Sequence, residues 1–274
     1  MKKPIIGSVL LNVALVLGAA VTLMPLVWMV AASFMSVGEA NSLPPRLLPR
    51  DPTLENYTAL FTRLDFLRNF TNSAVVTILA TVLSVLVNSL AGYAFAKLPF
   101  AGREKLFRTL ASALVVPAQV GMLPLFLMMR ELGLVNTYAG VIVPYLASIF
   151  GIFLIRQYAL SVPDDLLDAA RIDGAGEFRI FRMVALPIIK PILVTMAAFT
   201  FLSAWNDFMW PLIVLSDSEM YTLPVALANL VGEHVQDTEL MMAGSVVTIL
   251  PALVVFLIFQ RTFVTGIMAG GVKE

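Results

Sequence analysis

Six long stretches that are almost free of charged side chains constrain the fold of this chain more than any other feature. They cover residues 4–38, 70–96, 109–129, 132–155, 191–216 and 240–260, and Asp207 is the one charged residue within them. A bilayer core about 30 Å thick needs roughly 20 apolar residues per helix, because each residue advances the helix by about 1.5 Å. We therefore predict an all-α membrane protein with six transmembrane helices in one domain, 1–274, at about 9–33, 70–96, 109–129, 138–155, 188–214 and 240–260.

The overall composition agrees with a chain threaded through lipid. Hydrophobic residues make up 59% of the sequence and charged residues 13%, against about 25% charged in an average soluble domain. The net charge is zero and no basic run is present, so we expect no nucleic acid partner. The absence of cysteine excludes disulfides, thiolate metal sites and a cysteine nucleophile.

The distribution of Lys and Arg predicts the orientation. Six spans place both termini on the same side of the membrane. If that side is the cytoplasm, thirteen of the 18 basic residues lie inside and five lie outside, which satisfies the positive-inside rule. The first apolar run is longer than the roughly 7–15 residues of a signal-peptide core, so we expect a retained anchor.

Two outside loops differ in composition. Prolines between residues 43 and 52 disfavour a helix, so the segment 34–69 is expected to form an extended strap. The segment 215–239 carries five acids and the only histidine, His234. A metal site is one interpretation of that segment. A solvated acidic loop explains the same residues, and we expect no metal.

The inside loop, residues 156–190, contains a helix signal. Ser161 offers a capping hydroxyl, Pro163 favours a first turn, and Asp164 and Asp165 suit the positive end of a helix dipole. Gly174 would end the helix in a left-handed conformation. The pattern predicts a helix over 163–174, followed by a second short helix from Glu177 to Ala185 that leads into the fifth span.

One face of the first predicted helix is small and apolar. Leu166, Ala169, Ala170 and Asp173 share this face by their spacing. Two interpretations are open from the residues alone: the helix lies on lipid headgroups, or it docks onto a cytoplasmic protein.

At this loop the sequence resembles the permease subunits of bacterial ABC importers. Their signature is Glu-Ala-Ala, three residues, Gly, nine residues, Ile, one residue, Leu-Pro. Here Asp168-Ala169-Ala170, Gly174, Val184 and Leu186-Pro187 stand at the same spacing, with Asp168 in place of Glu and Val184 in place of Ile. Both departures keep the chemical type.

Other segments are similar to the carbohydrate branch of this family, in particular to the second permease of maltose-type systems. They are residues 204–208 (Ala-Trp-Asn-Asp-Phe), 221–225 (Tyr-Thr-Leu-Pro-Val), 260–264 (Gln-Arg-Thr-Phe-Val) and 269–273 (Ala-Gly-Gly-Val-Lys). The resemblance covers nearly the whole chain.

The resemblance implies a permease of the bacterial inner membrane that works with several partners. These are a second permease in a heterodimer, two cytoplasmic ATPase subunits that bind ATP and Mg, and an extracytoplasmic solute-binding protein that delivers a sugar. It also implies that Asp168, Ala169, Ala170, Gly174, Leu186 and Pro187 couple the chain to the ATPase, and that the tail 261–274 reaches the ATPase dimer. This chain itself is expected to bind no cofactor.

The residues also argue against catalysis by this chain. A P-loop needs a Gly-Lys pair, and none occurs in the sequence. No nucleophile, base and orienting acid come together in a motif. We therefore expect a non-catalytic subunit that works by alternating access.

Two alternatives remain open. The same machinery could import a polyol or a glycerol phosphate. An ion-driven secondary transporter is the other alternative, but it predicts paired acids or inverted repeats at the midplane, whereas only Asp207 lies within a span.

The fifth span contains a candidate solute contact. Trp205, Asn206 and Asp207 combine an aromatic face with hydrogen-bonding groups, which suits a sugar. Asn206 and Asp207 point about 100° apart on a helix, so we expect only one of them to line the path. The alternative is structural, with Asp207 paired to a neighbouring helix or capping a break before Pro211.

Overall fold

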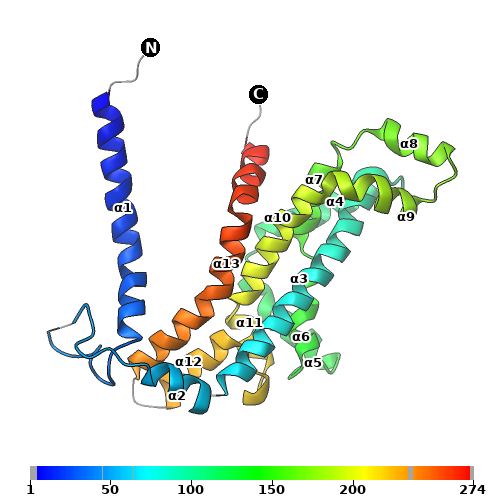
Figure 1. Cartoon of the computed structure of the whole chain (residues 1–274). Helices are drawn as coiled ribbons and strands as arrows, with labels where there is room; N and C mark the ends of the chain where they lie inside the picture. Colours follow the sequence, from blue (N-terminus) through cyan, green and yellow to red (C-terminus); the bar gives the residue numbers. More distant parts are fainter. Residues whose placement is uncertain (1–4, 45, 64, 234–236, 272–274) are drawn as a thin grey trace. The chain divides into compact units, whose positions relative to one another are not determined.

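The computed structural model describes residues 5–44, 46–63, 65–233 and 237–271, and all regular structure among them is helical (Figure 1). The helices are α1 (Ile5–Ala32), α2 (Glu55–Arg63), α3 (Phe66–Lys97), α4 (Arg103–Ser112), α5 (Met122–Glu131), α6 (Tyr138–Ile142), α7 (Ile149–Ala159), α8 (Asp164–Ile172), α9 (Glu177–Ile180), α10 (Leu186–Trp205), α11 (Met209–Val214), α12 (Leu223–Glu233) and α13 (Thr238–Gly271). A π-helical turn, Phe181–Ala185, joins α9 to α10, so this stretch is one continuous helix.

Within the described residues, five helical segments are long and apolar enough to cross a membrane. They are Val9–Ala32, Phe66–Lys97, Tyr138–Ala159, Glu177–Trp205 and Thr238–Gln260. The count becomes six if Arg103–Val115 and Ala118–Glu131, which meet at an angle of 103°, are taken as one span. The all-α fold and its five to six spans are confirmed, whereas the orientation stays a prediction.

The third span was expected as one helix over 109–129 and is instead broken in its middle. Val116 is extended, with φ −79° and ψ 122°, and Pro117 follows it. Proline lacks an N–H and disfavours the helical conformation of the residue before it, which accounts for the break at this point.

The fourth and fifth spans are also interrupted. In the fourth, α6 passes through a 3₁₀ turn, Val143–Tyr145, and the chain becomes extended at Ser148 before α7 begins. In the fifth, α10 ends at Trp205, and α11 begins after Asn206–Phe208. The ranges 138–155 and 188–214 are therefore helical spans with a break inside, rather than continuous helices.

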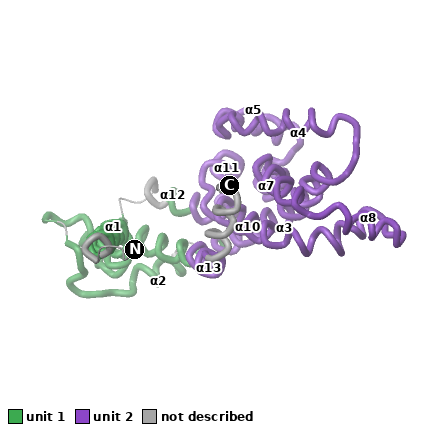
Figure 2. Tube along the Cα trace, turned by 90° about the horizontal axis from the view of Figure 1, so that it is seen from above, with its two compact units in different colours: residues 1–68, 226–250 green, residues 69–225, 251–274 purple. Residues whose placement is uncertain are grey.

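The chain divides into two compact units (Figure 2). One consists of residues 1–68 and 226–250, and the other of residues 69–225 and 251–274. That the whole of 1–274 acts as one transmembrane domain stays a prediction.

In the first unit, hydrogen bonds order the strap that follows α1. The Asn56 amide donates to the carbonyls of Ser33 and Met35, and the buried Glu239 accepts from the Ala40 N–H at 2.7 Å. The N–H of Arg50 donates to the Glu39 carboxylate, which holds the pKa of Glu39 below its usual range. Side chains of its own unit thus anchor the first part of this segment, whereas the expectation of an extended strap over all of 34–69 is wrong, because Glu55–Arg63 form α2 and α3 begins at Phe66.

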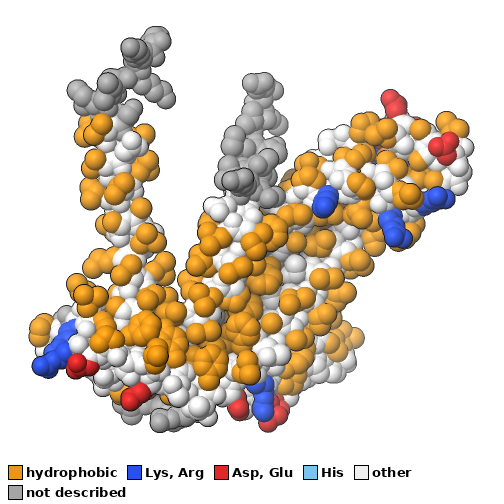
Figure 3. Space-filling model, in the orientation of Figure 1, with side chains coloured by type: hydrophobic (Ala, Val, Ile, Leu, Met, Phe, Trp, Pro, Cys, Tyr) orange, Lys and Arg blue, Asp and Glu red, His pale blue; other side chains and the backbone are white. Residues whose placement is uncertain are grey.

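The second unit packs α3 against α7 and α10. Its largest apolar cluster includes Tyr93, Ile155, Leu167, Ile180 and Ile189, all buried. On the face shown in Figure 3, hydrophobic side chains cover the flanks of the helices, and charged side chains gather mainly near the helix ends. This pattern is expected of helices that face hydrocarbon along their length.

Close approach of α3 and α7 requires glycine at position 92. A Cβ there would lie 2.7 Å from Cγ2 of Ile155, a side chain with no exposed surface. We predict that Gly92→Ala destabilises the protein by about 1–3 kcal/mol through overpacking. The apparent Tm of the detergent-solubilised protein, followed by size-exclusion chromatography, should fall.

Gly18→Ala is the matched control, because Gly18 is also inside a helix and a Cβ there meets nothing within 4 Å. It should leave the Tm unchanged or slightly higher. Equal Tm values for both variants would contradict the packing described for α3 and α7.

Candidate functional site

Helix α8 is the element that the loop sequence predicts, with one difference at its start. It begins at Asp164, and Gly174 adopts φ +79° just after its end, as a terminating glycine should. Pro163 occupies the N-cap position, and the Ser161 hydroxyl donates instead to the carbonyl of Tyr158. The expectation that Ser161 caps the helix is therefore wrong, whereas the helix and its glycine end are confirmed.

The two faces of α8 differ in exposure. Leu167 is 1% exposed and packs in the cluster with Tyr93 and Ile180. On the predicted small face, Leu166, Ala169 and Asp173 are exposed and Ala170 is half-buried. One side of α8 thus anchors it to its unit, and on the other side Leu166, Ala169 and Asp173 are left uncovered by the described residues.

Arg171 ties the signature acid to the next helix. Its guanidinium donates to Oδ1 of Asp168 at 2.7 Å and to Oε1 of Glu177 at 2.7 Å. Both carboxylates raise the pKa of Arg171 above its usual value, and Glu177 has the larger effect. Because Glu177 begins α9, this double ion pair braces the turn at Gly174 from both sides.

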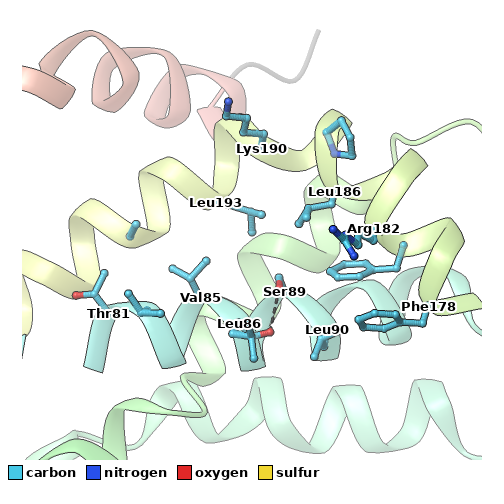
Figure 4. A pocket seen from close by; sticks show the side chains of 14 residues that line it. Thr81, Val85, Leu86, Ser89, Leu90, Phe178, Arg182, Leu186, Lys190 and Leu193 are labelled. Atoms are coloured by element: carbon cyan, nitrogen blue, oxygen red, sulfur yellow. Dashed lines mark hydrogen bonds between the residues drawn. The ribbon is translucent and has the colours of Figure 1, made fainter. Parts of the chain in front are cut away.

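Leu186 and Pro187, at the end of the signature, lie away from the uncovered face of α8. They line an apolar groove of about 900 Å³ together with Val85, Leu86 and Leu90 of α3 (Figure 4). The structure therefore divides the six predicted coupling residues between the α8 face and turn, and the groove.

The three residues predicted to contact solute have different surroundings. The Trp205 side chain is 2% exposed, with its ring parallel to Phe201 and edge-on to Phe70. Asn206 is exposed and its amide donates to the Leu202 carbonyl. The Asp207 carboxylate accepts from the Tyr145 hydroxyl at 2.6 Å and from the N–H of Trp210 at 3.3 Å. Asp207 thus both pairs with a neighbouring span and caps the break before Pro211.

Asn88 is a structural residue that the sequence analysis did not single out. It has no exposed surface and donates to the Leu146 carbonyl at 3.1 Å while accepting from the Ser148 N–H at 2.9 Å. These bonds satisfy the backbone where the fourth span breaks. An asparagine inside an apolar run was the signal available for it, since polar side chains at that depth usually have a partner.

No group of three or more His, Cys, Asp or Glu residues that could hold a metal ion occurs in the described part of the chain. His234 lies outside the described residues, and so do the side chains of the tail 261–274.

Comparison with known proteins places these features in a family. The model of the family described as "Binding-protein-dependent transport system inner membrane component" matches residues 88–268, which contain the whole signature. The chain belongs to this family. It is a permease subunit of the bacterial inner membrane, it catalyses no reaction, and subunits of this kind bind no cofactor. By its description, the family is the inner-membrane component of a transport system that depends on a binding protein.

Two relatives are similar over almost their entire length. The arabinooligosaccharides transport system permease protein AraQ of Halalkalibacterium halodurans is 40% identical, with 97% of this chain and 96% of that protein aligned. The lactose transport system permease protein LacG of Rhizobium radiobacter is 32% identical, with 94% and 93% aligned. A solved structure of a bacterial ABC transporter that imports the acidic polysaccharide alginate has a chain 27% identical at a TM-score of 0.84, with coverage of 93% and 96%.

The bond between Tyr145 and Asp207 should contribute measurably to stability. Tyr145→Phe leaves one carboxylate oxygen without its hydroxyl partner, and we expect a loss of about 1–3 kcal/mol. The apparent Tm in detergent should fall, and the effect should shrink in an Asp207→Ala background because the two changes remove the same bond.

Tyr158→Phe serves as the control, since no hydrogen bond from the Tyr158 hydroxyl is present among the described residues. If Tyr145→Phe and Tyr158→Phe shift the Tm equally, the Tyr145 bond does not stabilise the break in the fifth span.

Proposed function

We propose that this chain is one of two different permease subunits in an importer of sugars or oligosaccharides. The observation that carries the proposal is α8, a short helix anchored on one side, uncovered on the other, and ended by the left-handed Gly174. A helix of this kind suits a docking contact with another protein, in a family whose energy source is a separate ATPase. The relatives named for arabinooligosaccharides and lactose support carbohydrate as the solute class.

In the proposed mechanism, two ATPase subunits close on ATP and Mg and move the docked α8. The movement passes to the spans, which alternate between an outward and an inward access state. The binding protein loads the path from outside. Asp168, Ala169, Ala170 and Gly174 form the docking contact and its turn, whereas Leu186 and Pro187 act in the groove beside α3. The tail 261–274 is proposed as a further ATPase contact.

Basic residues at the same end of the second unit support the proposed orientation. Lys97 bonds Asp164 at the start of α8, and Arg171 of α8 bonds Glu177. Arg156 donates to the Phe95 carbonyl near the end of α3. Their positive charge supports a cytoplasmic position for α8.

The solute path is proposed to pass Asn206. Its side chain is exposed, whereas neighbouring aromatic rings cover Trp205 and the pairing with Tyr145 occupies Asp207. Non-helical backbone at membrane depth is tolerated where protein buries it or where it lines a water-filled cavity. The break at 206–208 therefore supports a water-accessible path on the Asn206 side.

The complex with its ATPase and binding proteins, reconstituted in vesicles, tests the solute class. Arabinooligosaccharides, lactose and glycerol 3-phosphate would each be offered with the binding protein while ATP hydrolysis is measured. We expect sugars to stimulate hydrolysis. Stimulation by glycerol phosphate alone would overturn the sugar assignment and support the phosphate alternative.

The Gly174 turn should be essential for transport. A β-branched residue at φ +79° is strongly strained, so Gly174→Val should lower transport by about tenfold. Gly176→Val is the control in the same loop, because Gly176 has φ −72° and ψ 157°, which valine adopts readily. Transport by Gly174→Val at the level of Gly176→Val would rule out this turn as part of the coupling contact.

The path can be tested by labelling, because the natural chain has no cysteine. Asn206→Cys should react with a membrane-impermeant thiol reagent in at least one of two states, without nucleotide or trapped with an ATP analogue. Trp205→Cys should react far less in both. Failure of Asn206→Cys to react in either state would show that the path runs elsewhere.

A further inference from the structure

Lys97, the last residue of α3, lies outside the signature and makes a set of contacts with the chain next to α8. Its side chain is 6% exposed. The ammonium donates to the Val162 carbonyl at 2.6 Å, to Oδ1 of Asp164 at 2.7 Å, and to the Leu160 carbonyl at 3.4 Å. An ammonium group has three N–H donors, so all of them are used here.

All three acceptors belong to one short stretch of chain, residues 160–164, which joins α7 to the start of α8. A cation with so little exposure is costly unless it stays paired and hydrogen-bonded. The end of α3 therefore cannot move away from the start of α8 without leaving a buried charge unsatisfied.

The stretch 160–164, to which Lys97 bonds, is also held by apolar packing. Val162 is 1% exposed and lies in the same apolar cluster as Leu167 of α8 and Tyr93 and Ala96 of α3. A displacement of α8 must then carry the end of α3 with it, through both the apolar contacts and the ammonium.

Farther along α3, Asn88 holds the break of the fourth span at Leu146 and Ser148. The Tyr145 hydroxyl next to that break bonds Asp207 at the break of the fifth span. Hydrogen bonds and helix backbone thus connect α8, by way of Lys97 and α3, to the interrupted fourth and fifth spans.

We propose that Lys97 is a positioning residue that transmits the movement of α8 to α3, and through α3 to the broken spans. The proposal rests on the proposed role of α8 as the ATPase contact. Lys97 touches neither ATP nor solute, and its role is to keep ATP hydrolysis and solute movement linked. Asp164, whose side chain is 75% exposed, supplies a charged acceptor at 2.7 Å, and the Val162 carbonyl holds the ammonium in the less accessible part of the contact at 2.6 Å.

The test uses the complete reconstituted complex and measures ATP hydrolysis and solute uptake on the same preparation. Lys97→Met keeps most of the side-chain volume and removes the donors. We expect uptake to fall by about tenfold, a loss typical of a removed charged hydrogen-bonding partner, while hydrolysis per complex stays within about twofold of the natural protein. Lys105→Ala, an exposed cation on α4, is the control and should leave both rates unchanged.

A purely structural role for Lys97 would lower uptake and hydrolysis by the same factor, and this result would overturn the proposal. Unchanged uptake would overturn it as well. If Lys97→Met reduces the yield of complex, Asp164→Ala decides, because it removes one acceptor at an exposed position: an unchanged ratio of uptake to hydrolysis contradicts the link. Normal transport by Gly174→Val would refute the docking role of α8 separately from the role of Lys97.

Discussion

Hydrogen-bond satisfaction of the backbone inside lipid is the constraint on which the rest of this structure depends. No water is available in the hydrocarbon core, so a span must be helical or must find side-chain partners where the helix stops. Two of the interrupted spans in the second unit meet this requirement with polar side chains. Asn88 satisfies the backbone around Ser148, and Asp207 accepts the N–H of Trp210. The same constraint makes breaks in membrane helices rare. The candidate solute contact Asn206 lies at one of these breaks.

The end of the second unit that carries α8 is organised by a different set of forces. There Arg156 lies 3.9 Å from the ring centre of Phe107 and bonds Glu104 at 3.0 Å, while Arg171 bridges Asp168 and Glu177. Ion pairs at an exposed boundary contribute little each, but a network fixes geometry. This arrangement gives α8 a defined attachment on one side and leaves Ala169 exposed on the other, which is what a transmitted movement requires.

The sequence predicts the parts of this structure that depend on local chemistry. Run lengths between charges predict the spans, and Gly174 predicts the end of α8, since a left-handed residue is needed there. The break near Ser148 depends on a distant partner, Asn88, and could not be located from local pattern. Asp207 and Pro211 indicated the break near Asn206, but not that Tyr145 would be the partner of Asp207. Pro117 is present in the sequence of the third span, but the angle of the bend there could not be predicted from it. Burial of Trp205 by Phe70 and Phe201 likewise results from packing between segments. The sequence alone therefore suggested that Trp205 is more accessible to a sugar than the structure shows.

The proposed coupling depends most directly on contact between α8 and the ATPase. A single cysteine at Ala169 on the exposed face, in a chain that otherwise has none, can be cross-linked within the purified complex. A cysteine at Leu167, which packs into its own unit, is the matched control. The account predicts that Ala169→Cys forms a covalent product with the ATPase subunit and that Leu167→Cys does not. An intact complex in which Ala169→Cys yields no such product would contradict it.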